Sequence, residues 1–298
     1  MHTIAMTTAQ GSLLVVVFVF GCAVGSFLNV CIWRMPRGLG INSPRRSFCP
    51  RCSTPINWFD NIPVLSFIAL GGKCRACGKG ISWRYPAVEL VTGLLFALVY
   101  HRQGVQVQTE AGQLVIMMLL TALLIVGSGI DIDWLIIPDE ISLFGILGGL
   151  AAGLLLPGLH VGDMSYHTFG PSAMNPHLGG LLGAGIGMFV GGGIVLGCAL
   201  FGYLIFRKEA MGIGDAKLLG MVGAFFGWKV ALITFFISPF VGLLYGVPIL
   251  LTRDEHVMPY GPFLSVGAVV TMVFRSSLCG RLAGWIDSLA VVTGGTVG

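Results

Sequence analysis

The chain has 298 residues, of which 55% are hydrophobic and only 10% are charged, and its mean hydropathy is +0.88. This composition excludes an ordinary soluble domain and predicts an all-α polytopic membrane protein. The 45 glycines favour a helical bundle, because small residues let helix backbones approach closely in lipid. The net charge of +4 comes without basic residues interleaved with aromatic ones, so nucleic acid is not an expected partner.

Apolar windows of about 20 residues predict eight transmembrane helices, so membrane lipid is the expected surrounding. The first segment has no Lys or Arg before it, which predicts a retained helix instead of a cleaved signal peptide. Two segments, the second and the sixth, are short for a full span, and a half-helix or re-entrant piece is the alternative for the sixth. In chain order the predicted helices cover residues 11–32, 86–101, 112–130, 140–158, 177–206, 216–228, 230–251 and 261–279.

Basic residues predict the orientation of the chain in the membrane. Short loops rich in Lys and Arg stay cytoplasmic, and residues 33–85 hold more than half of the 17 Lys and Arg residues. We therefore expect a cytoplasmic insert at 33–85, a first helix within 1–32 whose N-terminus faces outward, and a transmembrane bundle over 86–298. Counting helices onward from the insert places Asp131 and Asp215 at the same cytoplasmic face.

Two Cys-x2-Cys motifs lie in the insert. Cys49 and Cys52 form the first motif, and Cys74 and Cys77 form the second. Four thiolates at this spacing predict a closed tetrahedral site for structural zinc, which supplies folding free energy to a segment with few large apolar residues. Two disulfides or a redox-active pair are the alternatives, although the cytoplasm keeps thiols reduced.

Two acidic clusters border predicted helices. Asp131 follows one helix, and Asp215 closes a Gly-x-Gly-Asp stretch with Gly212 and Gly214. An ionised carboxylate at membrane depth costs about 3 kcal/mol on insertion scales, so its presence indicates a functional site. Two such carboxylates that share a proton can perform aspartic protease chemistry, and the glycines let an extended substrate backbone approach. The hypothesis is a protease dyad of Asp131 and Asp215.

Other interpretations of these carboxylates stay open on residue chemistry alone. Both could be helix-end groups that pair with Lys217 or Arg207, or ion sites of a proton- or cation-coupled transporter. Their expected position at one membrane face, away from the midplane, favours the protease. Asp139, which follows Pro138, is interpreted either as an N-terminal helix cap together with Ser142 or as a group that supports catalysis.

An ordered set of short motifs runs through nearly the whole chain. Beside the two cysteine motifs, it comprises the stretches from Gly25 to Val30, Asn61 to Ser66, Ile81 to Pro86, Asp131 to Asp139, Glu209 to Leu218 and Pro259 to Phe263. Together these motifs resemble those of the type IV prepilin leader peptidases, which are bifunctional membrane enzymes. The resemblance implies an aspartic endopeptidase, with Asp131 and Asp215 as its catalytic pair, in the bacterial inner membrane.

The resemblance also implies the substrates and cofactors. Expected substrates are type IV prepilins or the pseudopilins of type II secretion, whose basic leader is cut after Gly at the cytoplasmic face. S-adenosylmethionine is the implied donor for methylation of the new N-terminus, and the cysteine insert belongs to the methyltransferase half. No glycine-rich nucleotide loop marks a donor site. Glu89, Arg34 and Arg84 are the candidate cofactor-binding residues, with a helix-dipole role for Glu89 and topological roles for both arginines as alternatives.

Overall fold

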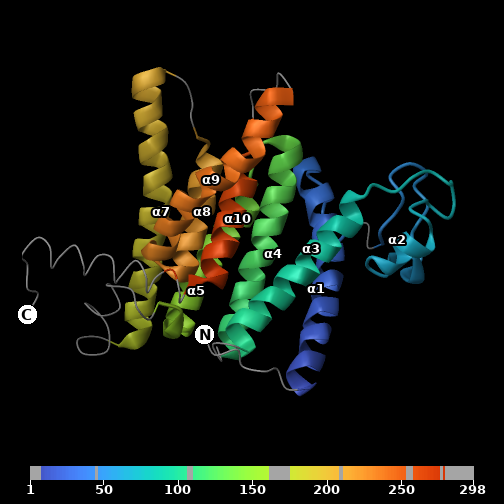
Figure 1. The fold of residues 1–298 in the computed structure, drawn as a ribbon, viewed down its shortest axis with the longest axis horizontal. Coiled ribbons are helices and arrows are strands. Elements are labelled where there is room, and N and C mark those ends of the chain that lie inside the picture. Colours follow the sequence, from blue (N-terminus) through green and yellow to red (C-terminus); the bar gives the residue numbers. More distant parts are fainter. Residues whose placement is uncertain are drawn as a thin grey trace, which may run out of the picture. The chain divides into compact units, whose positions relative to one another are not determined.

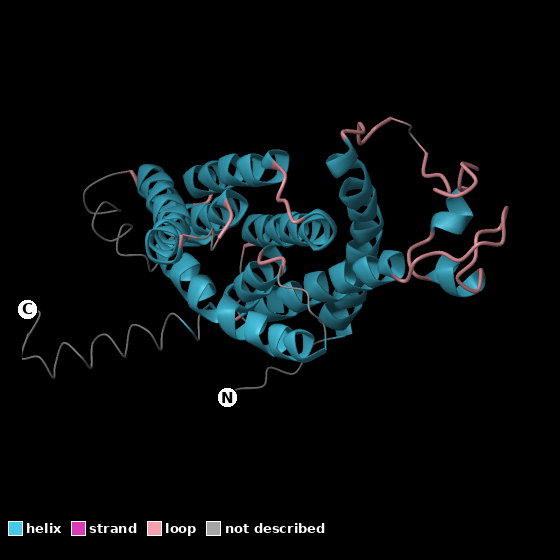
Figure 2. Cartoon of the chain, turned by 90° about the horizontal axis from the view of Figure 1, so that it is seen from above, coloured by secondary structure: helices cyan, strands magenta, loops and turns pink. Residues whose placement is uncertain are grey.

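The computed structural model describes residues 8–43, 46–105, 110–160, 175–207, 211–252, 258–275 and 278. Within these residues every regular element is a helix and no strand is drawn (Figure 2), which confirms the predicted all-helical class. The chain divides into two compact units, Met1–Gly145 and Ile146–Gly298. The boundary between them falls within helix α5 (Asp139–Leu155).

The first unit contains three long helices and the cysteine insert (Figure 1). The long helices are α1 (Thr8–Arg34), α3 (Arg84–Val99), which continues as the π-helical turn η3 (Tyr100–Val105), and α4 (Ala111–Trp134). The insert lies between α1 and α3 and, in its described residues, forms only short helices. These are η1 (Met35–Arg37), η2 (Trp58–Asn61) and α2 (Leu65–Ala69).

Helices α1 and α3 pack closely because glycines lie at their contact. A Cβ atom on Gly21 would lie 2.8 Å from the Cα atom of Gly93, and one on Gly25 would lie 2.7 Å from the α3 backbone. One turn further along α1, the Asn29 side chain donates a hydrogen bond of 3.0 Å to the Tyr85 carbonyl. A spacing of four residues therefore places Gly21, Gly25 and Asn29 on the face of α1 that meets α3.

An apolar cluster joins the three long helices of the first unit. Gly129 brings α4 close to α1, since a Cβ atom there would lie 2.6 Å from the Cδ1 atom of Ile32. In lipid, close packing holds such a cluster together more than removal from water does. The buried members of the cluster are Leu28, Cys31, Ile32, Phe96, Ala122, Val126, Ile130 and Ile141.

The second unit is built around one short buried helix. It contains the end of α5, the 3-10 turn η4 (Pro157–His160), α7 (Pro176–Phe206), α8 (Ile213–Phe226), α9 (Trp228–Thr252) and α10 (Gly261–Val273) (Figure 1). Helix α8 packs against α7, α9 and α10. Every residue from Ala216 to Phe226 except Lys217 is buried, so α8 forms the centre of this unit.

Glycines also allow α7 and α8 to touch. A Cβ atom on Gly187 would overlap the carbonyl oxygen of Gly223, and one on Gly191 would lie 2.5 Å from the carbonyl oxygen of Leu219. Gly193, on another side of α7, has open space around the position of its Cβ. One face of the glycine-rich stretch in α7 therefore serves helix packing, in line with the bundle that the glycine content predicts.

Among the described residues, three helices are long and apolar enough to cross a membrane, namely Thr8–Arg37, Ala111–Trp134 and Pro176–Ile205. Trp228–Leu244 and Gly261–Val273 are shorter apolar helices. Each predicted segment coincides with a helix, but the ends differ. Helix α4 runs past residue 130 to Trp134. Helix α10 covers Gly261–Val273, and residues 276–277 and 279 of the segment predicted to end at 279 lie outside the described residues. With 14 residues, α8 is about 21 Å long, less than the thickness of a bilayer core.

Candidate functional site

The four cysteines of the insert converge on one point. The Sγ atoms of Cys49, Cys52, Cys74 and Cys77 lie within 4.8 Å of one another, and those of Cys49 and Cys77 are 4.0 Å apart. Four sulfurs placed tetrahedrally around zinc, each ~2.3 Å from the ion, are ~3.8 Å apart. The cluster therefore fits a zinc ion. All four residues are free thiols, so the disulfide alternative does not describe this structure.

Two turns with the same hydrogen-bond pattern bring the sulfurs together. In the first turn, the Cys49 N–H donates to the Thr54 carbonyl at 3.0 Å and the Ser53 N–H donates to the Cys49 carbonyl at 2.8 Å. The same two bonds recur in the second turn, around Cys74. The residue after each motif has a positive φ, 57° at Ser53 and 67° at Gly78. This conformation turns the chain back and directs both thiols of a motif to one side.

The surroundings of the thiols set how readily they ionise. The hydroxyl and backbone of Thr54 bond to the Cys52 sulfur and lower the pKa of this thiol to about 6. The Lys79 backbone N–H favours the thiolate of Cys77, but burial and the neighbouring thiols outweigh it and raise the pKa of Cys77 to about 11. Zinc binds thiolates and displaces their protons, so a bound ion keeps such a group deprotonated.

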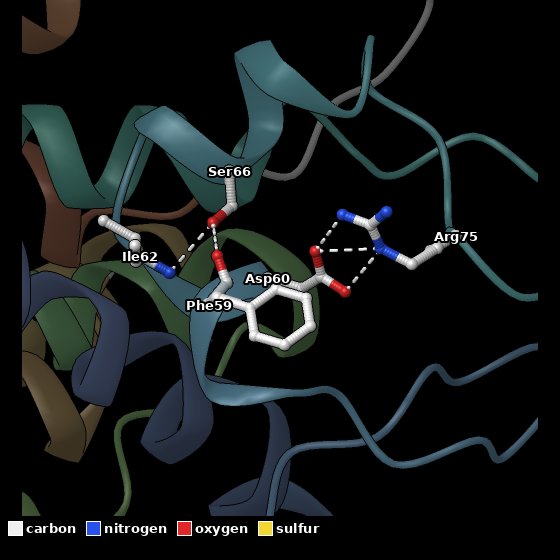
Figure 3. A network of polar contacts seen from close by, with 5 residues as sticks. All are labelled: Phe59, Asp60, Ile62, Ser66 and Arg75. Carbon is white, nitrogen blue, oxygen red and sulfur yellow. Dashed lines mark hydrogen bonds and ion pairs between the residues drawn. The ribbon is translucent and has the colours of Figure 1, made fainter.

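Polar contacts hold η2 beside the second cysteine turn. The Arg75 guanidinium binds both carboxylate oxygens of Asp60 at 2.7 to 3.1 Å (Figure 3) and holds the pKa of Asp60 below its usual range. The Ser66 hydroxyl donates a bond of 2.8 Å to the Phe59 carbonyl and accepts one of 2.9 Å from the Ile62 N–H. The wall of the insert is therefore tied to the cysteine cluster through a neighbour of Cys74.

A cavity of about 570 Å³ lies between the insert and the facing parts of α1 and α3, all within the first unit. Its walls include Asn29 and Trp33 from α1, Asn61 from the insert, and Tyr85 and Glu89 from α3. A volume of this size, with aromatic walls and a few polar groups, is typical of small-molecule sites.

Glu89 is a buried carboxylate in the wall of this cavity. Its Oε2 atom accepts a hydrogen bond of 2.8 Å from the Val64 N–H, and the Ser26 hydroxyl also bonds to it. Val64 has φ 62° and ψ −48°, a conformation that β-branched residues rarely adopt. Among the three candidate cofactor-binding residues, Glu89 therefore stands out. Its carboxylate lies in the cavity wall and is hydrogen-bonded to Val64, whose backbone is strained.

The two arginine candidates have structural partners. Arg34 lines the cavity, but its guanidinium donates to carbonyls of the loop after η1, the closest at 2.6 Å. Arg84 forms an ion pair with Asp133 and donates a bond of 2.5 Å to the Gly129 carbonyl. It is absent from the cavity wall formed by the described residues. Arg34 therefore anchors the insert, and Arg84 ties the start of α3 to the end of α4.

Asp131 lies in the last turn of α4 and is only 6% exposed. The helix ends where Leu135 adopts a φ of 54° and donates its N–H to the Asp131 carbonyl at 2.9 Å. Arg84 bonds to Gly129 and Asp133, the residues two before and two after Asp131. The backbone that carries Asp131 is therefore fixed on both sides.

Asp215 is the third residue of α8 and is half-buried. Its Oδ2 atom accepts a hydrogen bond of 3.1 Å from the N–H of Gly212, whose backbone is extended with φ −82° and ψ 154°. At this position the helix dipole favours the ionised carboxylate. Gly214 lies in the first turn of α8 and adds no side chain beside Asp215.

Asp139 is the first residue of α5 and is exposed. The hydroxyl of Ser142, its expected capping partner, donates to the Pro138 carbonyl at 3.4 Å. Asp131 and Asp139 belong to the first unit and Asp215 to the second.

Sequence reasoning missed the cavity, the strained backbone at Val64 and the pair of Arg84 with Asp133. The cavity walls come from segments far apart in the chain, and no local pattern marks such a site. The ion pair did have a signal, because opposite charges stood at the predicted cytoplasmic ends of two helices.

Two family models and several known proteins match this chain, and all of them bear the name of a peptidase. The model described as "Bacterial Peptidase A24 N-terminal domain" matches residues 19–103, and the one described as "Type IV leader peptidase family" matches residues 118–247. A protein of Aeromonas salmonicida (strain A449) is 32% identical over 290 residues, which cover 88% of this chain and 91% of that protein. No solved structure matches the chain.

Two further relatives come from other bacteria. A protein of Pseudomonas aeruginosa is 33% identical over 294 residues, covering 87% of this chain and 89% of its own length. A protein of Myxococcus xanthus (strain DK1622) is 37% identical over 241 residues, covering 81% of this chain and 64% of its own length. All three relatives bear the name prepilin leader peptidase/N-methyltransferase. With this identity over most of its length, the chain belongs to the type IV leader peptidase family.

Proposed function

We propose that the chain is a membrane aspartic endopeptidase that removes the basic leader of type IV prepilins or pseudopilins and methylates the new N-terminal residue. The observation that carries this function is 32% identity, over 88% of the chain, to a protein named for both activities. Both the part with the cysteine insert and the part with Asp215 have a matching family model. The names of the relatives give the transporter hypothesis no support.

Asp131 and Asp215 form the catalytic dyad of this peptidase. Two carboxylates close enough to share a proton cannot both ionise, so the pair titrates as a unit. The protonated member polarises the scissile carbonyl while the other takes a proton from the attacking water. Burial of Asp131 at a helix end and the placement of Asp215 at a helix start support these roles.

The backbone around Asp215 suits an extended substrate. A peptide bond inside a helix is shielded, so the substrate has to unwind locally before it is cut. Gly212 is extended and exposed, and neither Gly212 nor Gly214 carries a side chain that would block a second strand. Asp139, exposed at the start of α5, is proposed as a supporting carboxylate.

The protein crosses the bacterial inner membrane eight times, with its N-terminus outside and the insert and dyad at the cytoplasmic face. Its parts are the first helix (1–32), the insert (33–85) and the peptidase bundle (86–298). The concentration of Lys and Arg in the insert supports this orientation. The prepilin leader is basic and cytoplasmic, so a dyad at that face meets its substrate there.

Zinc bound by Cys49, Cys52, Cys74 and Cys77 has a structural role. All four coordination positions are filled by protein thiolates, which leaves no open position for a reactant. S-adenosylmethionine is the methyl donor, as the resemblance of the chain implies.

The dyad is tested by Asp131→Asn and Asp215→Asn. Each variant should lower cleavage of a peptide with a basic leader, Gly, Phe and an apolar run by about 10²- to 10⁴-fold, because proton transfer is lost. The purified protein in detergent is incubated with the peptide, and the rate of cleavage is measured by mass spectrometry of the products. Methylation of a peptide supplied already cleaved should continue in both variants.

The matched control is Glu140→Gln, which neutralises an exposed carboxylate in the first turn of α5. It should cleave within twofold of the original protein. An Asn variant at either dyad position that cleaves as fast as this control would remove that residue from the catalytic pair.

A further inference from the structure

We propose that the cavity between the insert and helices α1 and α3 is the methyl-transfer site, where S-adenosylmethionine meets the freed substrate N-terminus and Glu89 accepts the proton of its amine. The inference rests on the proposed N-methyltransferase function and assigns that function a place in the fold and a base.

One face of α1 lines the cavity. Ser26, Asn29, Val30 and Trp33 recur at helical spacing and all contribute to its wall. The seven steps from Ser26 to Trp33 correspond to a rise of about 10 Å along the helix. Ser26 bonds to Glu89, so the carboxylate lies near one end of this face and the Trp33 ring near the other. Two reactants can therefore lie in one cavity.

The Trp33 end suits the methyl donor. The rings of Trp33 and Phe48 meet edge to face, with centroids 5.7 Å apart and planes at 86°, and both residues line the cavity. Two rings at this angle form an apolar corner against which a purine can pack. Aromatic faces attract cations, and the Arg37 guanidinium already lies 4.7 Å from the centroid of the Trp33 ring, so the Phe48 ring is the one left to face a sulfonium. Asn61, which lines the cavity from the insert, adds an amide that can bond to ribose hydroxyls or to the amino acid end of the donor.

The Glu89 end suits the acceptor. A buried carboxylate attracts an ammonium group, and one oxygen of Glu89 is already held by the Val64 N–H. Val64 keeps its unfavourable φ of 62° where it makes this bond. Backbone strain of this kind costs about 1–3 kcal/mol and is found where function requires a fixed geometry. Val64 and Ser26 therefore position the carboxylate for an incoming amine.

The transfer uses Glu89 as a general base. The carboxylate takes one proton from the substrate ammonium and leaves a neutral amine with a free electron pair. When bound, S-adenosylmethionine supplies the methyl group: the amine pair forms the new N–C bond as the C–S bond breaks, and sulfur keeps the bonding pair as a thioether. The product amine carries the positive charge and leaves with it.

Hydrogen bonds within the first unit connect the helix that lines this cavity to the backbone around Asp131. Arg84 begins α3, five residues before Glu89, and bonds to Gly129 and Asp133 on either side of Asp131. The segment that lines the acceptor end is therefore tied directly to the turn that carries one member of the proposed dyad.

A binding measurement tests the location. S-adenosylmethionine is cross-linked by ultraviolet light to the intact, zinc-loaded protein in detergent, and the labelled peptides are mapped by mass spectrometry. The proposal predicts label on peptides that contain Trp33, Phe48 or Tyr85. Saturable label found only outside residues 26–89 would overturn it.

Glu89→Gln tests the base with a peptide supplied already cleaved. At pH 7 methylation should fall about 10²-fold or more. Raising the pH to 9 should narrow this deficit, because an α-amine with a pKa near ~8 then loses its proton without a base. The control is Glu110→Gln, an exposed carboxylate of the same unit, which should methylate normally at both pH values. An equal deficit of Glu89→Gln at both pH values would mean a structural role only and overturn its assignment.

A second variant covers the case in which Glu89→Gln fails to fold. Asn57 lines the cavity, is exposed and makes no side-chain capping bond. Asn57→Trp should fill the cavity and weaken S-adenosylmethionine binding at least tenfold, whereas Ile68→Trp, on the exposed side of α2, should bind within twofold. If Asn57→Trp and Ile68→Trp bound S-adenosylmethionine equally well, the proposed location of the methyl-transfer site would be refuted, but the methyltransferase function would not. Original protein that cleaves but methylates no peptide would instead refute the methyltransferase function itself.

Discussion

Gly25 shows how a missing side chain serves packing and chemistry together. A Cβ atom there would lie 2.7 Å from the Cα atom of Glu89 and 2.9 Å from the Oγ1 atom of Thr92, closer than real Cβ atoms approach other groups. The absence of that atom lets α1 lie against α3, so that Ser26 reaches the Glu89 carboxylate. The glycine content of the sequence predicted close helix packing, but the link of Gly25 to Glu89 is visible only in the structure.

Gly25→Ala should therefore lower stability and disturb the cavity. Overpacking of this kind costs about 1–3 kcal/mol, and α1 can relieve it only by moving away from α3. Methylation should fall more than cleavage does. Thermal unfolding and the two activities, measured on one preparation, give the result.

The matched control is Gly11→Ala on the same helix, where a new Cβ atom meets nothing within 4 Å. Alanine there should be neutral or stabilising by up to about 1 kcal/mol, because alanine favours a helix over glycine. If Gly25→Ala left thermal stability and both activities as unchanged as Gly11→Ala does, the close contact between α1 and α3 at Gly25 would not contribute to stability.

At the level of elements, apolar length predicted where the helices lie, and local backbone chemistry decided where they end. The segment expected at 112–130 is the helix Ala111–Trp134 in the structure. Asp131 and Asp133 do not end the helix, which ends only where Leu135 adopts a φ of 54°. Such a positive φ in a leucine has no sequence signal. The short segment at 216–228 was recognised as unusual from its length, and its burial among three helices explains how it stays stable.

The cysteine cluster was predicted residue by residue, because four ligands at fixed spacing define their own geometry. The cavity beside it was not predicted, since Ser26, Asn61 and Glu89 belong to three separate segments. These residues line one cavity only because the insert folds back on α1 and α3. Contacts between remote segments are the part of a site that sequence patterns do not encode.

Removal of one zinc ligand should unfold the insert selectively. Cys74→Ser leaves three thiolates, and the loss of metal withdraws a binding free energy of about 10–16 kcal/mol that small zinc modules use to fold. We expect one zinc per chain in the original protein and little in the variant, with methylation lost because the insert forms one wall of the cavity.

Zinc content by elemental analysis and methylation of a peptide supplied already cleaved measure both effects. Cys198→Ser, which alters an exposed cysteine on α7, is the control and should retain zinc and activity. Full zinc content in Cys74→Ser would contradict the four-thiolate site.

For the whole molecule, the proposed function requires groups from both units. The cysteine cluster, the cavity and Asp131 belong to the first unit, and Asp215 belongs to the second. The sequence predicted that both aspartates lie at one membrane face by counting helices from the basic insert. The meeting of the two carboxylates, one from each unit, is therefore the central claim to be tested.

Cysteine cross-linking tests that claim most directly. Asp131→Cys and Asp215→Cys are combined in a Cys198→Ser background, and the zinc-loaded protein is oxidised mildly in membranes. A disulfide requires Cα atoms about 4.4–6.8 Å apart, so a dyad predicts an intramolecular link between positions 131 and 215, identified by mass spectrometry. The same experiment with Asp133→Cys in place of Asp131→Cys should link poorly. Folded protein in which 131 and 215 fail to link, or link no better than 133 and 215, would contradict a shared active site.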